Sequence, residues 1–199
     1  MHACGHDVHT SSLLGAAVIL NELKANIHGE IRLIFQPGEE KLPGGASMMI
    51  DIGLFNVGKP DRIIAQHVHP PLQAGHVGFR SGLYMASADE IYITIKGKGG
   101  HAATPHLCID PIVIAARAVT ALQEMISRTK DPMSPGVLTI GRIWSDGGAT
   151  NVIPDAVHME GTLRAMDERW RSATHQRIKT LIEHLCIASG ATSETKIVT

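Results

Sequence analysis

The sequence carries little net charge and has no long apolar run. Its 18 lysines and arginines nearly balance its 19 aspartates and glutamates, which leaves a net charge of −1 with histidine neutral. A protein that binds nucleic acid or an anionic membrane usually shows an excess of basic residues. No apolar stretch approaches the roughly 20 residues that a membrane-spanning helix needs. We therefore expect no nucleic acid and no membrane among the partners.

Cysteine is scarce as well. The three cysteines, Cys4, Cys108 and Cys186, are odd in number and widely spaced. This pattern argues against a disulfide framework and favours a reducing compartment. The chain opens directly in a motif of histidine and cysteine, so no signal peptide is expected ahead of it. These observations together predict a cytoplasmic protein.

Histidine, in contrast, is abundant and unevenly placed. Nine of the 12 histidines lie at or before His106. A role in solubility would scatter them, so we expect chemistry in the first half of the chain. The hydrophobic content of 44% is ordinary for a globular protein and is enough for a core.

The first region, residues 1–81, reads as part of an α/β domain. An apolar stripe predicts a helix over residues 10–24, and a second short helix is expected over 44–52. Cys4 and His6 then lie in the turn before the first helix, where the helix dipole favours a thiolate. Strands are expected over three short segments, residues 30–36, 62–66 and 77–81.

The second region, residues 82–199, has a different pattern. Residues 88–96 alternate, with Ile91, Ile93 and Ile95 on one face, as in a half-buried antiparallel strand. Asp110 and Pro111 are typical of a helix start. The full set of expected elements is strands at 88–96, 136–143, 156–165 and 195–198, with helices at 110–128 and 168–189. This order is βαββαβ, a ferredoxin-like split unit.

A candidate metal site comes from three segments of the first region. Cys4 and His6 lie two residues apart, while Glu39 and Glu40 follow a predicted strand, and His67 follows another. Thiolate, imidazole and carboxylate suit a borderline-soft divalent metal, and one spare carboxylate could act as a base. His69 alternates with His67, and the sequence barely chooses between them.

Other interpretations of these residues remain open. Cys4 and His6 could be a buried thiol and a capping histidine, or a nucleophilic Cys-His pair. The second alternative leaves the two glutamates and His67 without a role. Adjacent glutamates are also common in solvated turns.

The second region holds further candidates. Residues 97–102 match a dinucleotide-binding fingerprint superficially, but Pro105 interrupts the expected helix and no acidic residue follows at the required distance. His101, on this glycine-rich loop, could donate a hydrogen bond to an oxyanion. Asn151 and Arg164 frame a strand, and an arginine can grip a carboxylate through two hydrogen bonds. An ordinary surface arginine and loop asparagine are the alternative.

Several of these motifs together resemble the hippurate hydrolase-like amidohydrolases. That family includes N-acyl-amino-acid hydrolases and auxin-conjugate hydrolases, within the aminoacylase and carboxypeptidase-G clan of dinuclear metallopeptidases. The matching motifs occur in the family's order and extend over essentially the whole chain. They are His2 to Asp7, Pro37 to Glu40, Gly97 to His106, Asp110-Pro111 and Asn151 to Pro154.

The resemblance implies a role for each metal-site residue. It implies two divalent ions, of zinc, manganese, cobalt or nickel. Cys4 would bridge them, and the terminal ligands would be His6, Glu40 and His67. Glu39 would be the general base that activates the bridging water.

The resemblance also implies that residues 82–199 form a lid and dimerisation domain of a homodimer. His101 would reach the site of the partner subunit and steady the oxyanion. Asn151 and Arg164 would contact the substrate carboxylate and the oxyanion.

The expected function is hydrolysis of the amide bond of N-acyl amino acids by a metal-activated water. Family members carry further sheet strands before and after the matched region, with a last metal-binding histidine, so the chain is expected to be truncated at both ends. A second polypeptide could complete the sheet. One alternative is a catalytically inactive homologue that acts as a dimerising interaction module or is a relic. Another is a mononuclear metal-binding protein without turnover.

Overall fold

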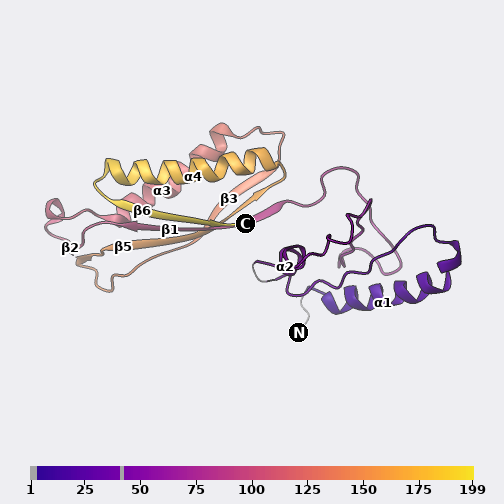
Figure 1. Cartoon of the computed structure of the whole chain (residues 1–199). Helices are drawn as coiled ribbons and strands as arrows, with labels where there is room; N and C mark the ends of the chain where they lie inside the picture. The colour runs from indigo at the N-terminus through magenta and orange to yellow at the C-terminus, as the bar shows by residue number, and fades with distance from the viewer. Residues whose placement is uncertain (1–3, 41–42) are drawn as a thin grey trace. The chain divides into compact units, whose positions relative to one another are not determined.

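The computed structural model describes residues 4–40 and 43–199, so the first residues of the His2 to Asp7 motif lie outside the described part. The chain divides into two compact units, Met1–Phe79 and Arg80–Thr199 (Figure 1). Each unit is described by itself below.

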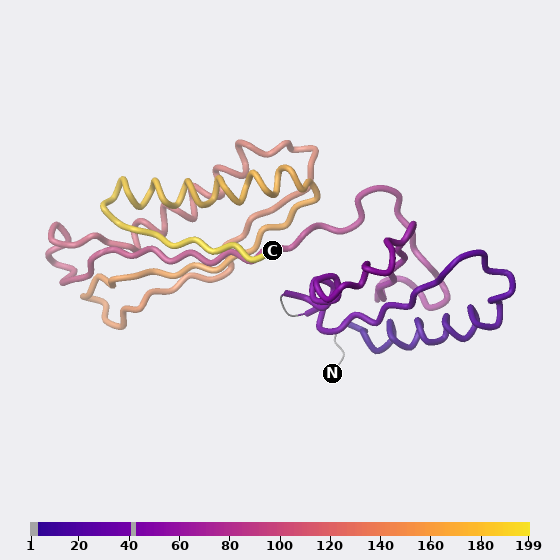
Figure 2. The backbone as a smooth tube through the Cα atoms, viewed as in Figure 1, coloured from indigo at the N-terminus to yellow at the C-terminus, as the bar shows by residue number. Residues whose placement is uncertain are grey.

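The second unit is a four-stranded antiparallel sheet with two helices on one face (Figure 1). Its elements follow the chain order β1 (Ser87–Lys96), α3 (Pro111–Thr129), β3 (Gly136–Ser145), β5 (Ala156–Ala165), α4 (Glu168–Ala188) and β6 (Thr192–Val198). The strand order in the sheet is β3-β5-β1-β6, and the last strand runs beside β1 (Figure 2). The predicted ferredoxin-like βαββαβ unit is therefore confirmed.

The core of this unit follows from the alternation along β1. Ile91, Ile93 and Ile95 are at most 1% exposed, while the residues between them point to the open face of the sheet. The buried isoleucines pack in one cluster with apolar residues of both helices, including Leu122 of α3 and Ile178 of α4. Burial of such side chains stabilises a fold by about 1.5–3 kcal/mol each.

Both helices of the second unit begin at an aspartate cap. Asp110 accepts hydrogen bonds from the backbone N–H groups of Ile112 and Val113, and Pro111 occupies the first helical turn. Asp167 caps α4 in the same way through the N–H of Trp170. These caps satisfy donors that the helix itself leaves without partners. The predicted start of α3 is confirmed.

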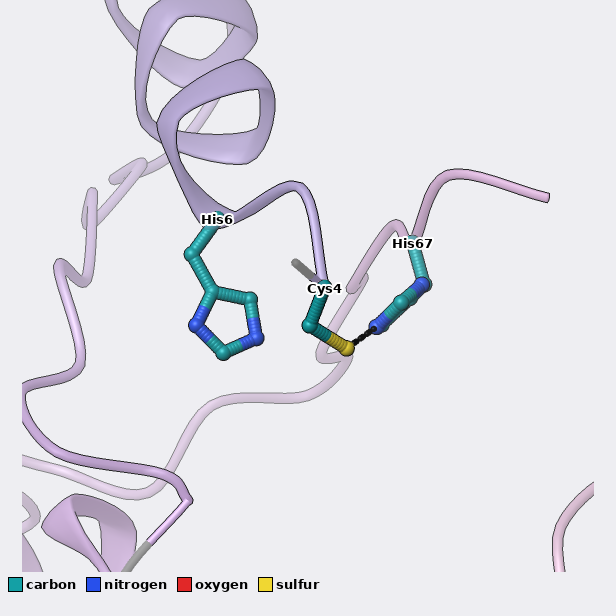
Figure 3. A group of neighbouring side chains, drawn as sticks. All are labelled: Cys4, His6 and His67. Carbon is teal, nitrogen blue, oxygen red and sulfur yellow. Dashed lines mark hydrogen bonds between the residues drawn. The ribbon is translucent and has the colours of Figure 1, made fainter. Parts of the chain in front are cut away.

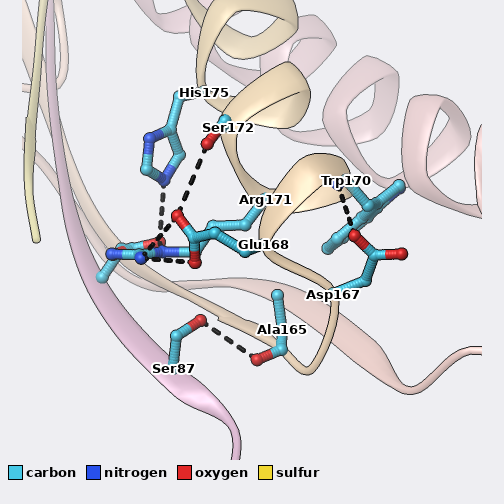
Figure 4. A network of polar contacts seen from close by, with 9 residues as sticks. Ser87, Ala165, Asp167, Glu168, Trp170, Arg171, Ser172 and His175 are labelled. Carbon is cyan, nitrogen blue, oxygen red and sulfur yellow. Dashed lines mark hydrogen bonds and ion pairs between the residues drawn. The ribbon is translucent and has the colours of Figure 1, made fainter.

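A buried carboxylate of β1 forms hydrogen bonds with Arg171 and His175 of α4, both of which are labelled in Figure 4. Asp89 is 1% exposed and accepts hydrogen bonds from the guanidinium of Arg171, at 2.8 Å from its Nε, and from Nε2 of His175, at 2.7 Å. Burial by itself would raise the pKa of Asp89. The hydrogen bonds and charges of Arg171 and His175 outweigh that effect, and the pKa lies below its usual value.

A short two-stranded ladder extends the second unit beyond the end of β1. It pairs β2 (Gly100–His101) with β4 (Val152–Ile153), and the single-turn 3-10 helix η2 (Pro105–Leu107) follows β2. The ladder places the glycine-rich loop beside the segment that precedes β5.

The first unit contains helices but no paired strand among its described residues. Helix α1 spans His6–Glu22 and is followed by the 3-10 helix η1 (Lys24–Asn26), while α2 spans Gly45–Asp51. Both predicted helices are confirmed, although α1 begins four residues earlier than expected.

The predicted strands at 30–36, 62–66 and 77–81 are wrong in this structure. A strand is held by hydrogen bonds to a neighbouring strand, and no described segment of this unit pairs with them. Their apolar side chains consequently remain exposed to solvent: Phe35 is 44% exposed and Ile64 is 93% exposed. The segments expected to form a partial catalytic sheet are thus present, but they are not paired with one another.

None of the helices in the described parts of the chain combines the length and apolar character needed to cross a membrane.

Candidate metal centre

The site begins at the turn that precedes α1 (Figure 3). Gly5 is the N-cap of the helix and has a left-handed backbone, φ 73°. As a glycine, it has no side chain that could accept a hydrogen bond from the first helical turn. A Cβ at this position would lie 2.6 Å from Cγ2 of Val68, so only glycine fits both the backbone and the contact. The turn brings Cys4 and His6 beside the segment that carries His67.

Cys4, His6 and His67 form a group of potential metal donors. Each residue offers one donor atom, and all three atoms lie within 4.8 Å of one another. Sγ of Cys4 lies 3.4 Å from Nε2 of His67 (Figure 3). Two such ligands on one tetrahedral ion would be about 3.6 Å apart, given bond lengths of about 2.3 Å for sulfur and about 2.1 Å for nitrogen.

A second group combines His6 with the two glutamates. Nε2 of His6 lies 3.7 Å from Oε2 of Glu39 and 3.6 Å from Oε1 of Glu40. These carboxylates follow a turn in which Gly38 has a positive φ of 53°. The start of α2 packs closely against the same turn. A Cβ at Gly45 would overlap the carbonyl of Pro37, so only glycine fits there.

The two groups share His6. Together they contain the five residues that the sequence predicts for the metal site: Cys4, His6, Glu39, Glu40 and His67. These residues come from three segments that are distant in the sequence.

The groups contain His67 rather than His69. Nδ1 of His67 lies 2.8 Å from the carbonyl oxygen of Val68. A carbonyl only accepts, so Nδ1 carries the proton and Nε2 keeps its lone pair facing Cys4. His69 is exposed, and its carbonyl accepts a hydrogen bond from the N–H of Leu72.

The electrostatics at Cys4 differ from the sequence-based expectation. The helix dipole predicts a thiolate, but the pKa of the Cys4 thiol is raised above its usual value. Partial burial is the main cause, and the hydrogen bond and negative charge of Glu40, with the charge of Glu39, add to it. The two carboxylates thus disfavour a negative charge on the Cys4 sulfur. A divalent cation bound there would offset this repulsion.

His9 belongs to the site although the sequence analysis did not single it out. Its Nε2 accepts a hydrogen bond from the N–H of Val68 at 3.0 Å, and its ring lies 4.4 Å from that of His67. Burial, with smaller effects from His67 and His6, lowers the pKa of His9. The spacing from His6 was the available signal, since residues three apart share a helix face.

The predicted residues of the second unit fall into two places. His101 lies in β2, opposite Val152 of β4, and the next residue, Ala102, donates its N–H to the carbonyl of Asn151 at 2.9 Å. Arg164 lies near the far end of β5, eight positions beyond Ala156. At about 3.3 Å per residue, that separation is about 26 Å along the strand. The structure therefore brings His101 and Asn151 together but not Arg164.

The proton of neutral His101 can be located from its contacts. Nδ1 of His101 accepts a hydrogen bond from the N–H of Ala103 at 3.1 Å. The other nitrogen, Nε2, then carries the proton and is a hydrogen-bond donor. This side chain is exposed.

The chain resembles known proteins over nearly its whole length. The sequence profile described as peptidase family M20/M25/M40 matches residues 1–189. An N-acyl-L-amino acid amidohydrolase of Geobacillus stearothermophilus is 43% identical over 98% of this chain and 52% of its own length. An N-acetyl-L-cysteine deacetylase of Bacillus subtilis is 42% identical over 98% of this chain and 46% of its own length.

Solved structures agree with these relatives. A putative aminohydrolase from methicillin-resistant Staphylococcus aureus superposes with a TM-score of 0.89 at 36% identity, over 99% of this chain and 50% of that one. A dinuclear metal-binding peptidase of the M20 family from Bacillus subtilis gives a TM-score of 0.76 at 36% identity, over 99% of this chain and 48% of that one. The chain spans about half the length of the relatives that it matches.

Proposed function

Because the chain belongs to peptidase family M20/M25/M40, we propose that it carries the metal-binding and lid portions of an amidohydrolase that cleaves N-acyl amino acids. The observation that carries this proposal is the meeting of Cys4, His6 and His67 with the Glu39-Glu40 pair around one shared imidazole. The relatives named as an N-acyl-amino-acid amidohydrolase and an N-acetylcysteine deacetylase support the substrate class.

The donor set fits divalent metal. Sulfur, imidazole nitrogen and carboxylate oxygen suit zinc, manganese, cobalt or nickel, and the contact distances suit shared ions. In the proposed site Cys4, His6, Glu40 and His67 would hold the ions. Bound ions would supply Lewis acidity, which polarises the amide carbonyl and lowers the pKa of water to about 7.

Glu39 is the proposed general base. Its carboxylate is 61% exposed and lies beside His6, so it can reach both solvent and the metal donors. It takes a proton from the attacking water and passes it to the nitrogen of the leaving amine. The acyl carbon first gains a bond to the water oxygen, which places negative charge on the carbonyl oxygen, and its bond to the nitrogen then breaks as that nitrogen receives the proton.

His101 is the proposed donor to the oxyanion. Its Nε2–H would face the negative charge that develops on the carbonyl oxygen during attack, and preorganised donors of this kind stabilise the transition state. Asn151 lies beside it and would assist. In the proposed homodimer these residues serve the site of the partner subunit.

Arg164 is the proposed contact for the substrate carboxylate. Because it lies about 26 Å along β5 from the end near Asn151, one protomer cannot place both residues on a small substrate. In the proposed enzyme, Arg164 and Asn151 that contact the same substrate molecule therefore come from different subunits.

The first unit is proposed to pair with further strands that complete its sheet. Segments 30–36 and 62–66 have exposed apolar side chains and no paired strand among the described residues. Added strands would hydrogen-bond to their backbones and cover those side chains.

Metal stoichiometry tests the proposed function. We expect the purified chain to bind divalent ions tightly and the Cys4→Ser/His6→Ala variant to lose them. Hydrolysis of a panel of N-acetyl amino acids, with Glu39→Gln as the base-deficient variant, then tests turnover. Equal weak binding in both proteins would instead favour a dimerising interaction module built on the second unit, which has its own core.

A further inference from the structure

The segment that carries His67 is held against α1 at the neighbouring residue, Val68. On one side, the N–H of Val68 donates to Nε2 of His9 at 3.0 Å. On the other side, the carbonyl oxygen of Val68 accepts from Nδ1 of His67 at 2.8 Å. Both polar groups of this residue are therefore engaged by imidazoles that are 58 positions apart in the sequence.

The side chain of Val68 is located as tightly as its backbone. It packs over Gly5, where any Cβ would lie 2.6 Å from Cγ2 of Val68. Gly5 in turn separates Cys4 from His6. The start of α1 and residues 67–68 thus pack directly against each other. Together these two segments include three of the candidate ligands.

The hydrogen bond from Val68 determines what His9 can do. Because Nε2 of His9 accepts an amide proton, that nitrogen has no lone pair left for a metal ion, and the ring proton resides on Nδ1. His9 also lies outside both groups of donor atoms found among the described residues. Its ring instead lies 4.4 Å from the His67 ring and 5.4 Å from the His6 ring.

We infer that His9 is a positioning residue for the metal centre. By holding the N–H of Val68, it fixes the position of the residue whose carbonyl orients His67, so that Nε2 of His67 faces Cys4. The role rests on the proposed function, since it presupposes that Cys4, His6 and His67 bind metal. Groups that orient metal ligands typically change metal affinity by about 10–100-fold when they are removed.

Cobalt titration of the full chain tests this role. The variants are His9→Phe, which retains a flat ring without an acceptor, and His9→Gln, whose amide oxygen can accept the Val68 N–H. His28→Gln, at an exposed histidine, is the matched control. We expect His9→Phe to raise the Kd for Co²⁺ about 10–100-fold and His9→Gln to recover most of that loss. The visible cobalt spectrum should be the same in every loaded protein.

A metal-free measurement gives a second readout. In the nitrogen-15 NMR spectrum of the unloaded chain, we expect His9 to be the Nδ1–H tautomer. We also expect the Val68 amide to exchange with solvent faster in His9→Phe than in His9→Gln. Circular dichroism shows whether α1 remains folded in each variant.

The outcomes separate the two proposals. If the unaltered chain binds cobalt and His9→Phe binds it equally well, the positioning role is wrong and the proposed metal site stands. If both His9 variants bind weakly and their cobalt spectra change, His9 is a ligand and the positioning role is wrong. If the unaltered chain binds no cobalt, the proposed function fails and this role fails with it.

Discussion

The two units differ in what they bury. In the second unit the sheet and both helices enclose a continuous apolar core. In the first, the only fully buried residue in the described part is Gly45, and apolar residues such as Leu14, Ile31 and Ile63 stay about half exposed or more. The unit with a complete core carries His101, Asn151 and Arg164, and the unit without one carries the candidate metal donors. The proposed metal chemistry and most of the apolar core therefore lie in different parts of this chain.

Removing a core side chain should have the largest effect and should separate the two units. Leu122 is 0% exposed, whereas Leu14 of α1 is 55% exposed. We expect Leu122→Ala to lower the free energy of unfolding of the second unit by about 3 kcal/mol. Leu14→Ala, in the first unit, should lower the free energy of unfolding of the chain by less than about 0.5 kcal/mol. Urea unfolding monitored by circular dichroism measures both, and equal effects would contradict the contrast.

The buried ion pair should give the next largest effect. Asp89→Asn removes the charge that Arg171 and His175 share. Hydrogen bonds to charged groups contribute about 1.5–3 kcal/mol, so we expect the second unit to lose about 2 kcal/mol. Asp131→Asn, at an exposed position, is the control. A loss no greater than that of the control would show that the network does not stabilise the fold.

The same carboxylate predicts a dependence on pH. The pKa of Asp89 is lower in the folded chain than in the unfolded chain, where it is about 3.9. Its contribution to stability is therefore complete above about pH 3.9 and is lost as the pH falls through the folded value. Unfolding free energies measured across this range should decrease less steeply in Asp89→Asn than in the unaltered chain. Parallel curves would assign the acid sensitivity to other groups.

Helix capping should give the smallest effect. Asp110 caps α3 with its side chain, while α1 starts at Gly5 without one. We expect Asp110→Ala to cost about 1 kcal/mol in the thermal or urea unfolding of the second unit. Ser134→Ala, in a loop of the same unit, should be close to neutral and serves as the reference. A neutral Asp110→Ala would mean that tertiary packing alone defines the start of α3.

The sequence predicted most of the second unit because its signals are local. The alternation of Ile91, Ile93 and Ile95 indicates a half-buried strand, and Asp110-Pro111 indicates a helix start, without reference to distant residues. In the first unit, segments 30–36 and 62–66 have strand-like composition. A strand, however, also needs a neighbour with which to pair, and no described segment of that unit supplies it.

The candidate site shows the same limit. Spacing proposed Cys4, His6 and the Glu39-Glu40 pair as donors, and the structure brings them together. Spacing could not separate His67 from His69, because that choice depends on how the backbone turns after residue 66. It also missed His9, whose contact is with a backbone amide rather than with a recognisable partner side chain.

The raised pKa of Cys4 has a consequence for the chemical durability of the unloaded protein. Alkylating agents and peroxides attack the thiolate rather than the thiol. Because partial burial and Glu40 raise the pKa of Cys4, the unloaded protein holds less thiolate than it would with an ordinary cysteine, and we expect slower oxidation of this sulfur. A bound cation would favour the thiolate and so remove this protection.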